Sequence, residues 1–461
     1  MAQITASIVL AIAVGVAPLA GQTSLSIYSD GRVVVRRTLP QALPKGRSSI
    51  ALKVEGLDPA TLFSPDTSVA VFSALLHPPT DREGALRRAV GQTLSFVRSR
   101  AGGGADTVRA SVVRLDPPQY RLPDGRMLLS EPGEPLFPAE LVRTAAEVAL
   151  VLDATRDRPR IELAYVSEGA AWEVLYQVVL LGTRCQVSGA ATITSQSLRA
   201  DSADVQLVAG SISRARVAPR PQLMMRGAMK VAAEEGPAAA TEEAVGETHV
   251  YDLPARMSLE AGTPITTALF PRSGAAYTQE LIVPGALPWR GFPGQAPGEE
   301  NRVPVQVWYT LKRARGTPFG ERPLPGGTVQ LYQADSAGRL QLVGEATSQH
   351  TAPGRDLRVQ AGDAFDITAE RVQTDYNQEP LAPPKRGMAP RQRITASYRV
   401  TISNAKPAAV TVDVREARSG VWRVTESSVG PEKLSATEVR FRVPVPANGD
   451  ATLTYTVQAE S

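Results

Sequence analysis

Apolar and polar residues alternate one by one through much of this chain, and the pattern is clearest between residues 392 and 461. Successive side chains of a β-strand point to opposite faces, so a period of two predicts strands that bury one face. The apolar positions of four such strands are Tyr398, Val400, Ile402, Val410, Val412, Val414, Val439, Phe441, Val443, Leu453, Tyr455 and Val457. Their spacing, with turns between them, is typical of an immunoglobulin-like sandwich.

Strand patterns also fill residues 160–208, where a long apolar strand begins near Trp172. We interpret Trp172 as a packing anchor, because an indole buries a large apolar area. The chain holds 37 Gly and 37 Pro, which favours many short elements joined by turns over long helices. The predicted class is therefore all-β, with several immunoglobulin-like β-sandwich domains, a small barrel-like insertion and a short helix.

The short helix is expected just after residue 80. Asp81 is a good helix N-cap, and a helix through Val90 would place several apolar residues on one face. These apolar residues are Ala85, Leu86, Ala89 and Val90.

Turn-rich stretches and shifts in composition divide the chain into segments. A Pro-, Lys- and Arg-rich stretch suggests a hinge, and an Ala- and Glu-rich run suggests disorder. The predicted segments are a signal peptide at 1–20, an N-terminal β-domain at 21–90, the small barrel-like insertion at 91–138, a central β-sandwich at 139–213 and 249–375, a disordered insertion at 214–248, the hinge at 376–391 and a C-terminal immunoglobulin-like sandwich at 392–461.

The amino terminus indicates export. Residues 4–19 are apolar and uncharged, and small residues near Ala20 suit a signal-peptidase site. The first basic residue is Arg32, although a signal peptide normally begins with Lys or Arg, so a retained anchor is the alternative. No later segment is long and apolar enough for a transmembrane helix. We expect a periplasmic, cell-surface or extracellular protein after the signal is removed.

Charge argues against a nucleic-acid partner. The 50 Lys and Arg residues against 46 Asp and Glu leave a formal charge of only +4 over the whole length. Two short basic groupings lack interleaved aromatic residues, so we interpret both as solvated loops or strand edges. They comprise Arg36, Arg37, Lys45 and Arg47, and then Lys312, Arg313 and Arg315.

Cysteine and methionine suggest little chemistry. Cys185 is the single cysteine and lies in a strand-like segment, so we expect a small buried side chain rather than a reactive thiol. Clustered methionines can bind copper in an oxidising compartment, and histidines folded together can hold a metal. The candidate metal ligands are His77, His249, His350, Met224, Met225 and Met229. The structural interpretation is a mobile apolar patch and three separate solvated histidines, with no cofactor.

Several segments, taken in order, resemble the bacterial domain of unknown function 4139. They are LAYVSEGAAWEVLY at 163–176, DVQLVAG at 204–210, HVYDLP at 249–254, LPGGTVQLY at 324–332, GDAFDI at 362–367 and SNAK at 403–406. Together they cover roughly residues 160–460. The family usually shows an Asn-containing stretch before the second segment, whereas Ser195, Gln196 and Ser197 stand here. The resemblance implies an exported all-β chain and supplies no catalytic residues.

Motifs of catalysis are missing from the sequence. No Gly-x-Ser-x-Gly elbow, His-Glu-x-x-His pair, Walker loop or Rossmann fingerprint occurs. Three hypotheses follow. The first is an envelope scaffold, structural or protein-binding, whose partners are other envelope proteins or cell-surface polymers. The second is a copper-binding or redox protein of the periplasm, and the third is a hydrolase of wall polymers or peptides. We favour the first, which needs no enzymatic activity and no catalytic residues.

Overall fold

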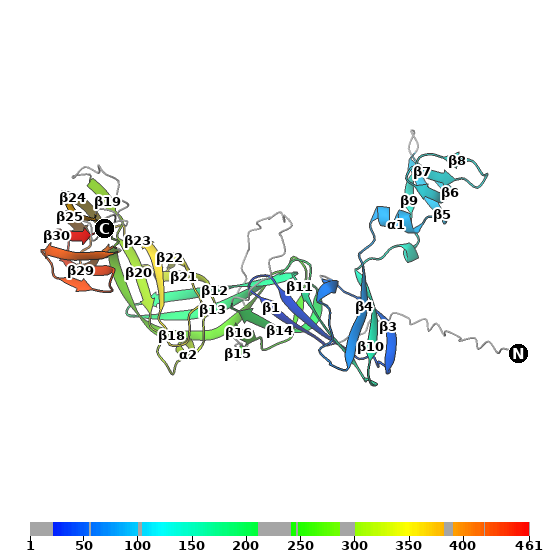
Figure 1. Cartoon of the computed structure of the whole chain (residues 1–461), viewed down its shortest axis with the longest axis horizontal. Coiled ribbons are helices and arrows are strands. Elements are labelled where there is room, and N and C mark those ends of the chain that lie inside the picture. Colours follow the sequence, from blue (N-terminus) through cyan, green and yellow to red (C-terminus); the bar gives the residue numbers. More distant parts are fainter. Residues whose placement is uncertain are drawn as a thin grey trace. The chain divides into compact units, whose positions relative to one another are not determined.

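Strands dominate the computed structural model, which describes residues 22–54, 57–99, 104–210, 241–245, 248–285, 300–381, 391–418 and 420–460 (Figure 1). The two α-helices among them are short, α1 (Arg82–Arg88) and α2 (Pro318–Glu321). The all-β class predicted from alternation is confirmed. In this part of the chain, neither helix has the length and apolar character needed to cross a membrane.

The chain divides into two compact units. Unit 1 contains Met1–Trp172, Ile193–Ala209 and Glu243–Ile265, and unit 2 contains the rest. The segment predicted as one central sandwich contributes residues to both units. The reason is that β14 (Ala200–Ala209) pairs with β1 (Gln22–Tyr28), a long-range pairing that no local pattern reveals.

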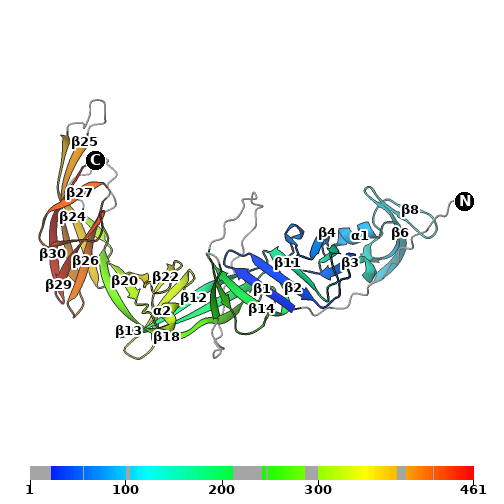
Figure 2. The same ribbon diagram turned by 60° about the horizontal axis from the view of Figure 1, so that its bottom comes forward.

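A seven-stranded sheet forms part of unit 1 (Figure 2). Its central strands β1 and β14 run parallel, and one face buries Leu25, Ile27, Val33 and Val35. The order is β11 (Ile161–Ser167), β2 (Val33–Leu39), β1, β14, β16 (Thr248–Asp252) and β15 (Thr241–Val245), with β17 (Met257–Leu259) also pairing β14. β15 lies within the insertion predicted to be disordered at 214–248. That prediction is wrong for this strand, because its backbone pairs in a sheet, while residues 211–240 lie outside the described residues.

A three-stranded sheet of unit 1 has β10 (Glu147–Ala154) at its centre, flanked by β3 (Gly46–Lys53) and β4 (Val69–His77). Its inner face is fully buried at Val148, Leu150 and Leu152. The 3-10 turn η1 (Pro59–Thr61) precedes β4 and is capped by Asp58. The pairing register of β10 and β4 changes after Val151. A β-bulge at this point leaves Phe72 of β4 without a paired residue on β10.

The predicted insertion at 91–138 is a small sheet. Its order is β8 (Met127–Leu128), β7 (Pro118–Arg121), β6 (Ala105–Leu115), β5 (Thr93–Ser99) and β9 (Glu134–Leu136), and η2 (Ala139–Leu141) follows it. β8 and β9 each pair with a single neighbour, so the sheet is open. Helix α1 packs Leu86 and Ala89 against its core of Phe96 and Tyr120.

The Asp81 cap of α1 is confirmed, since its carboxylate accepts from the Gly84 N–H at 2.7 Å. The predicted apolar face is wrong at its last residue. The helix ends at Arg88, the chain turns at Gly91 with φ +85°, and Val90 is left 45% exposed.

Unit 2 is built on a ten-stranded sheet. Its order is β22 (Leu340–Ser348), β21 (Gly327–Ala334), β12 (Ala170–Leu181), β13 (Arg184–Ser195), β18 (Ile265–Val283), β26 (Val410–Ala417), β29 (Glu438–Val445) and β28 (Pro431–Lys433), and β20 (Gln306–Leu311) pairs β18 and β23 (Leu357–Asp363). The 19-residue strand β18 carries the chain into the C-terminal core, which its last residues join at Leu281 and Val283.

The C-terminal sandwich places the end of this sheet over a five-stranded sheet. The second sheet has the order β19 (Glu300–Val303), β24 (Ile367–Leu381), β25 (Arg391–Asn404), β30 (Gly449–Glu460) and β27 (Val421–Ser427). The core joins Phe441 and Tyr455 to Val283 and Ile367, so the sandwich also recruits strands from before residue 392. The predicted hinge is likewise corrected: β24 continues to Leu381, paired with Arg391, and 382–390 lie outside the described residues.

Candidate functional site

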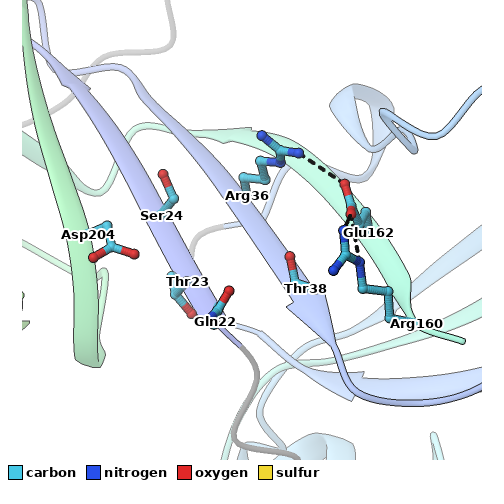
Figure 3. Close-up of a pocket in the computed structure, with 8 residues that line it drawn as sticks. All are labelled: Gln22, Thr23, Ser24, Arg36, Thr38, Arg160, Glu162 and Asp204. Atoms are coloured by element: carbon cyan, nitrogen blue, oxygen red, sulfur yellow. Dashed lines mark hydrogen bonds and ion pairs between the residues drawn. The ribbon is translucent and has the colours of Figure 1, made fainter.

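A shallow polar groove of about 250 Å³ crosses one face of the seven-stranded sheet (Figure 3). Strand pairing assembles it from distant segments, because Ser24 stands beside both Arg36 and Asp204, and Thr38 stands beside Glu162. The lining residues are Gln22, Thr23, Ser24, Arg36, Thr38, Arg160, Glu162 and Asp204. The groove therefore lies on the polar side of β11, β2, β1 and β14, opposite the buried face.

Two arginines flank one carboxylate in the groove. Arg36 Nη2 lies 3.0 Å from Glu162 Oε2, and Arg160 Nη2 lies 3.0 Å from Glu162 Oε1. The arginine side chains are 57% and 61% exposed, while Glu162 is 15% exposed. The hydrogen bond from Arg36, followed by its positive charge, lowers the pKa of Glu162 below its ordinary value. Glu162 is thus held as a carboxylate at neutral pH.

The opposite side of the groove carries the second acid. Asp204 Oδ1 lies 3.3 Å from Arg256 Nε, and both side chains of this ion pair are exposed. Hydroxyl and amide groups of Gln22, Ser24 and Thr38 occupy the space between the two charged ends. Arginine guanidinium groups bind carboxylates and phosphates through paired N–H donors. Hydroxyl groups can either donate or accept a hydrogen bond. This chemistry suits binding of a polar, anionic group.

A second unusual surface is the solvent-facing side of the three-stranded sheet, which we call the outer face. Phe72 and Leu75 of β4 are 58% and 59% exposed there. Beside them the outer face carries small or medium apolar groups on β10 and β3, with charged residues at the strand ends. Its further residues are Arg47, Ser49, Ala51, Lys53, Ala70, Ser73, His77, Glu147, Ala149, Val151 and Asp153.

The three predicted metal-binding histidines belong to different elements, His77 and His249 in unit 1 and His350 in unit 2. His77 is in β4 opposite Glu147, and His249 is in β16 opposite Ala209. His350 follows β22, where its Nδ1 accepts from the Gly326 N–H at 3.0 Å. In the described ranges no three or more His, Cys, Asp or Glu side chains gather into a group that could hold a metal.

The methionines of the copper hypothesis cannot be placed in the fold. Met224, Met225 and Met229 lie outside the described residues. No observed geometry therefore favours the copper hypothesis or a histidine-dependent hydrolase.

Cys185 and Trp172 occupy the places expected from sequence. Cys185 in β13 is 1% exposed, and burial raises the pKa of its thiol to about 11. Trp172 is 4% exposed and packs against Tyr251 with ring centroids 6.4 Å apart. Both predictions of buried packing roles are confirmed.

The second basic grouping is solvated at Lys312 and Arg315, as predicted, but not at Arg313. Arg313 is 2% exposed, and its guanidinium donates to five backbone carbonyl oxygens. These belong to Phe319 at 2.9 Å, Thr351 at 3.4 Å, Ala352 at 2.7 Å, Arg355 at 3.1 Å and Arg322. A loop with so many inward carbonyls needs a multivalent donor, and arginine offers five N–H groups. Arg313 is therefore structural.

Another buried polar cluster lies in the C-terminal sandwich. Glu416 is 0% exposed and accepts from the Tyr455 hydroxyl at 2.8 Å. Arg418 Nε lies 3.1 Å from Glu416, and Arg418 Nη2 donates to the Tyr398 hydroxyl at 3.0 Å. Burial, reinforced by the charge of Glu416, raises the pKa of Tyr455 well above its ordinary value. The tyrosine stays protonated and acts as a donor within the core.

Sequence reasoning missed the groove and the outer face. Arg36 was noticed only as part of a basic grouping, and its partner Glu162 is 126 residues away. The parallel pairing that brings Asp204 beside Ser24 leaves no local trace. The outer face did leave a signal. Residues 148–152 read VALVL, an unbroken apolar run that is typical of a strand covered on both faces.

No family model matches the chain, and no curated protein is similar to it in sequence.

Proposed function

We propose that this protein is an exported scaffold of the bacterial cell envelope that holds a partner rather than transforming a substrate. The observation that carries the proposal is the polar groove, with two exposed arginines around an ion-paired carboxylate. The resemblance to the domain of unknown function 4139 belongs to the same proposal, since that family is exported and all-β. So does the periplasmic or cell-surface location, which rests on the apolar residues 4–19.

The chemistry of the groove favours binding. General acid catalysis needs a group that is protonated near the working pH, whereas the Arg36 hydrogen bond keeps the pKa of Glu162 low. The exposed fractions of Arg36 and Arg160 leave N–H donors available to a second anion. The partner is therefore expected to offer carboxylate or phosphate groups, on an envelope protein or a surface polymer.

The test is capture of the partner from cross-linked cells. The variant Arg36→Ser/Arg160→Ser removes both guanidinium groups without touching the buried face of the sheet. Removal of two charge-assisted contacts is expected to lower recovery of the partner about tenfold or more. The matched control is Arg302→Ser/Arg339→Ser, which removes two exposed, acid-paired arginines of unit 2. Unchanged capture by the groove variant, or equal loss in the control, contradicts the proposal.

A further inference from the structure

The outer face of the three-stranded sheet has the character of a buried layer. Its central strand β10 is apolar on both sides, since Val148, Leu150 and Leu152 point inward while Ala149 and Val151 point outward. A sheet with two apolar faces is normally covered on both. On the outer face Phe72 and Leu75 are nevertheless more than half exposed. Contiguous apolar exposure of this kind marks an interaction surface.

The outer face has a ridge beside a trough. At one register the sheet carries Ala51, Ala149 and Leu75 in that order from β3 to β4, so two small side chains adjoin a large one. At the neighbouring outward-facing register, that of Val151, the β-bulge places Phe72 and Ser73 together on the exposed side of β4. Strand β4 therefore forms a ridge of large side chains, and β3 with β10 forms a trough of small ones at Ser49, Ala51 and Ala149. Arg47 closes one end of the trough, because it reaches across β10 to the Phe72 ring.

A second copy fits this shape. A two-fold axis running along β10, between two stacked outer faces, lays the β4 ridge of each copy over the β3 trough of the other. Such an isologous contact uses the same surface twice, as two-fold dimers do. Stacked sheets lie about 10 Å apart, which is enough for Leu75 to fill the space above Ala51 and for Phe72 to fill the space above Ser49 of the other copy.

The charges of the outer face also favour a second copy. Arg47 and Lys53 on β3 are balanced by Glu147 and Asp153 on β10, so the charges of these four residues cancel. Arg47 lies 3.8 Å from Asp153 and also rests on the Phe72 ring at 3.8 Å from its centroid. The axis along β10 sets Glu147 opposite Glu147 and Asp153 opposite Asp153, and it places each pair of acids between the Lys53 or Arg47 side chains of the two copies, which compensate their charge. We propose that the protein forms a two-fold homodimer by stacking its outer faces.

Sedimentation of the full-length protein over a range of concentrations tests the dimer. The wild-type protein is expected to sediment as a dimer, and Leu75→Asp is expected to weaken dimerisation about 100-fold by burying an unpaired charge in the contact. The matched control is Leu342→Asp, which changes an equally exposed leucine of a unit 2 strand and should leave the dimer intact. A monomeric wild-type protein, or an unchanged dimer in Leu75→Asp, overturns the proposal.

Cross-linking gives an answer even where a charge on β4 disturbs folding. The axis passes over β10, so Ala149→Cys brings two thiols together across the contact, and a short bis-maleimide should link them. Cys185 is buried with its pKa raised to about 11, so it does not compete for the reagent. Thr452→Cys on the exposed side of β30 is the control and should stay monomeric. Failure of Ala149→Cys to cross-link, or equal cross-linking by Thr452→Cys, counts against the stacked dimer.

Discussion

Unit 1 and unit 2 differ in where their charged side chains lie. Among the described residues, the buried charged side chains are Arg313, Arg371, Asp413 and Glu416, and all four belong to unit 2. None of these four lies in unit 1, where the paired arginines Arg36 and Arg160 stay exposed in the groove. Both units expose large apolar side chains, for example Leu75 in unit 1 and Leu342 in unit 2. Buried charges are tolerated only when they are bonded, so those of unit 2 serve the fold. The exposed groups of unit 1 do little for its own fold and are free to serve binding.

The outward faces of two sheets also differ. In the C-terminal sandwich, the exposed side of β25 and β30 pairs Ser397 with Thr456 at 2.9 Å and Arg393 with Glu460 at 3.0 Å. That is the polar surface that a solvated antiparallel sheet is expected to have. The outer face of β3, β10 and β4 is apolar instead, because Ala51, Val151 and Phe72 lie on it. A solvated sheet in the same protein thus provides an internal reference for the apolar one.

The largest expected effect is a loss of stability in the variant Arg313→Met, which tests the structural role of the buried charges. The change removes the guanidinium donor from five carbonyl oxygens, of which those of Thr351 and Ala352 keep a backbone N–H donor. We expect the free energy of unfolding of unit 2 to fall by about 3 to 5 kcal/mol. Urea unfolding followed by circular dichroism measures it. Arg315→Met, an exposed neighbour in the same basic grouping, should change it by less than about 0.5 kcal/mol. Equal effects of the two variants would show that Arg313 has no special role.

A much smaller effect on stability is expected from a substitution in the groove of unit 1, where the measured quantity is the pKa of Glu162. Arg36→Gln removes the main cause of the low pKa of Glu162, so this pKa should rise toward its ordinary value. The folded pKa lies below the unfolded one, so the ion pair stabilises the fold above the ordinary carboxyl pKa. That stabilisation is lost as the pH falls through the folded pKa. An NMR titration of the Glu162 carboxyl carbon checks this, with Arg302→Gln as the control. An unmoved pKa in Arg36→Gln would rule out the proposed electrostatics of the groove.

The sequence predicted best what depends on local periodicity. Alternation in β25, β26, β29 and β30 identified the sandwich, because side-chain direction in a strand is set by neighbouring residues alone. The Asp81 cap and the burial of Cys185 are equally local. Pairing between distant strands is not local, so the extension of β24 into the predicted hinge as far as Leu381 and the pairing of β1 with β14 were missed. Arg313 was misread for the same reason, since its carbonyl partners come from loops up to 42 residues away.

The central claim is that unit 1 holds a partner at its polar groove, and site-specific photo-cross-linking in intact cells tests it most directly. A photoreactive amino acid at Thr38, inside the groove, is compared with one at Thr452, on the polar outward face of the C-terminal sandwich. We predict one discrete adduct from Thr38 that Thr452 does not give, and that weakens when Arg36 and Arg160 are both replaced by serine. No adduct from Thr38, or the same adducts from both positions, would contradict the account.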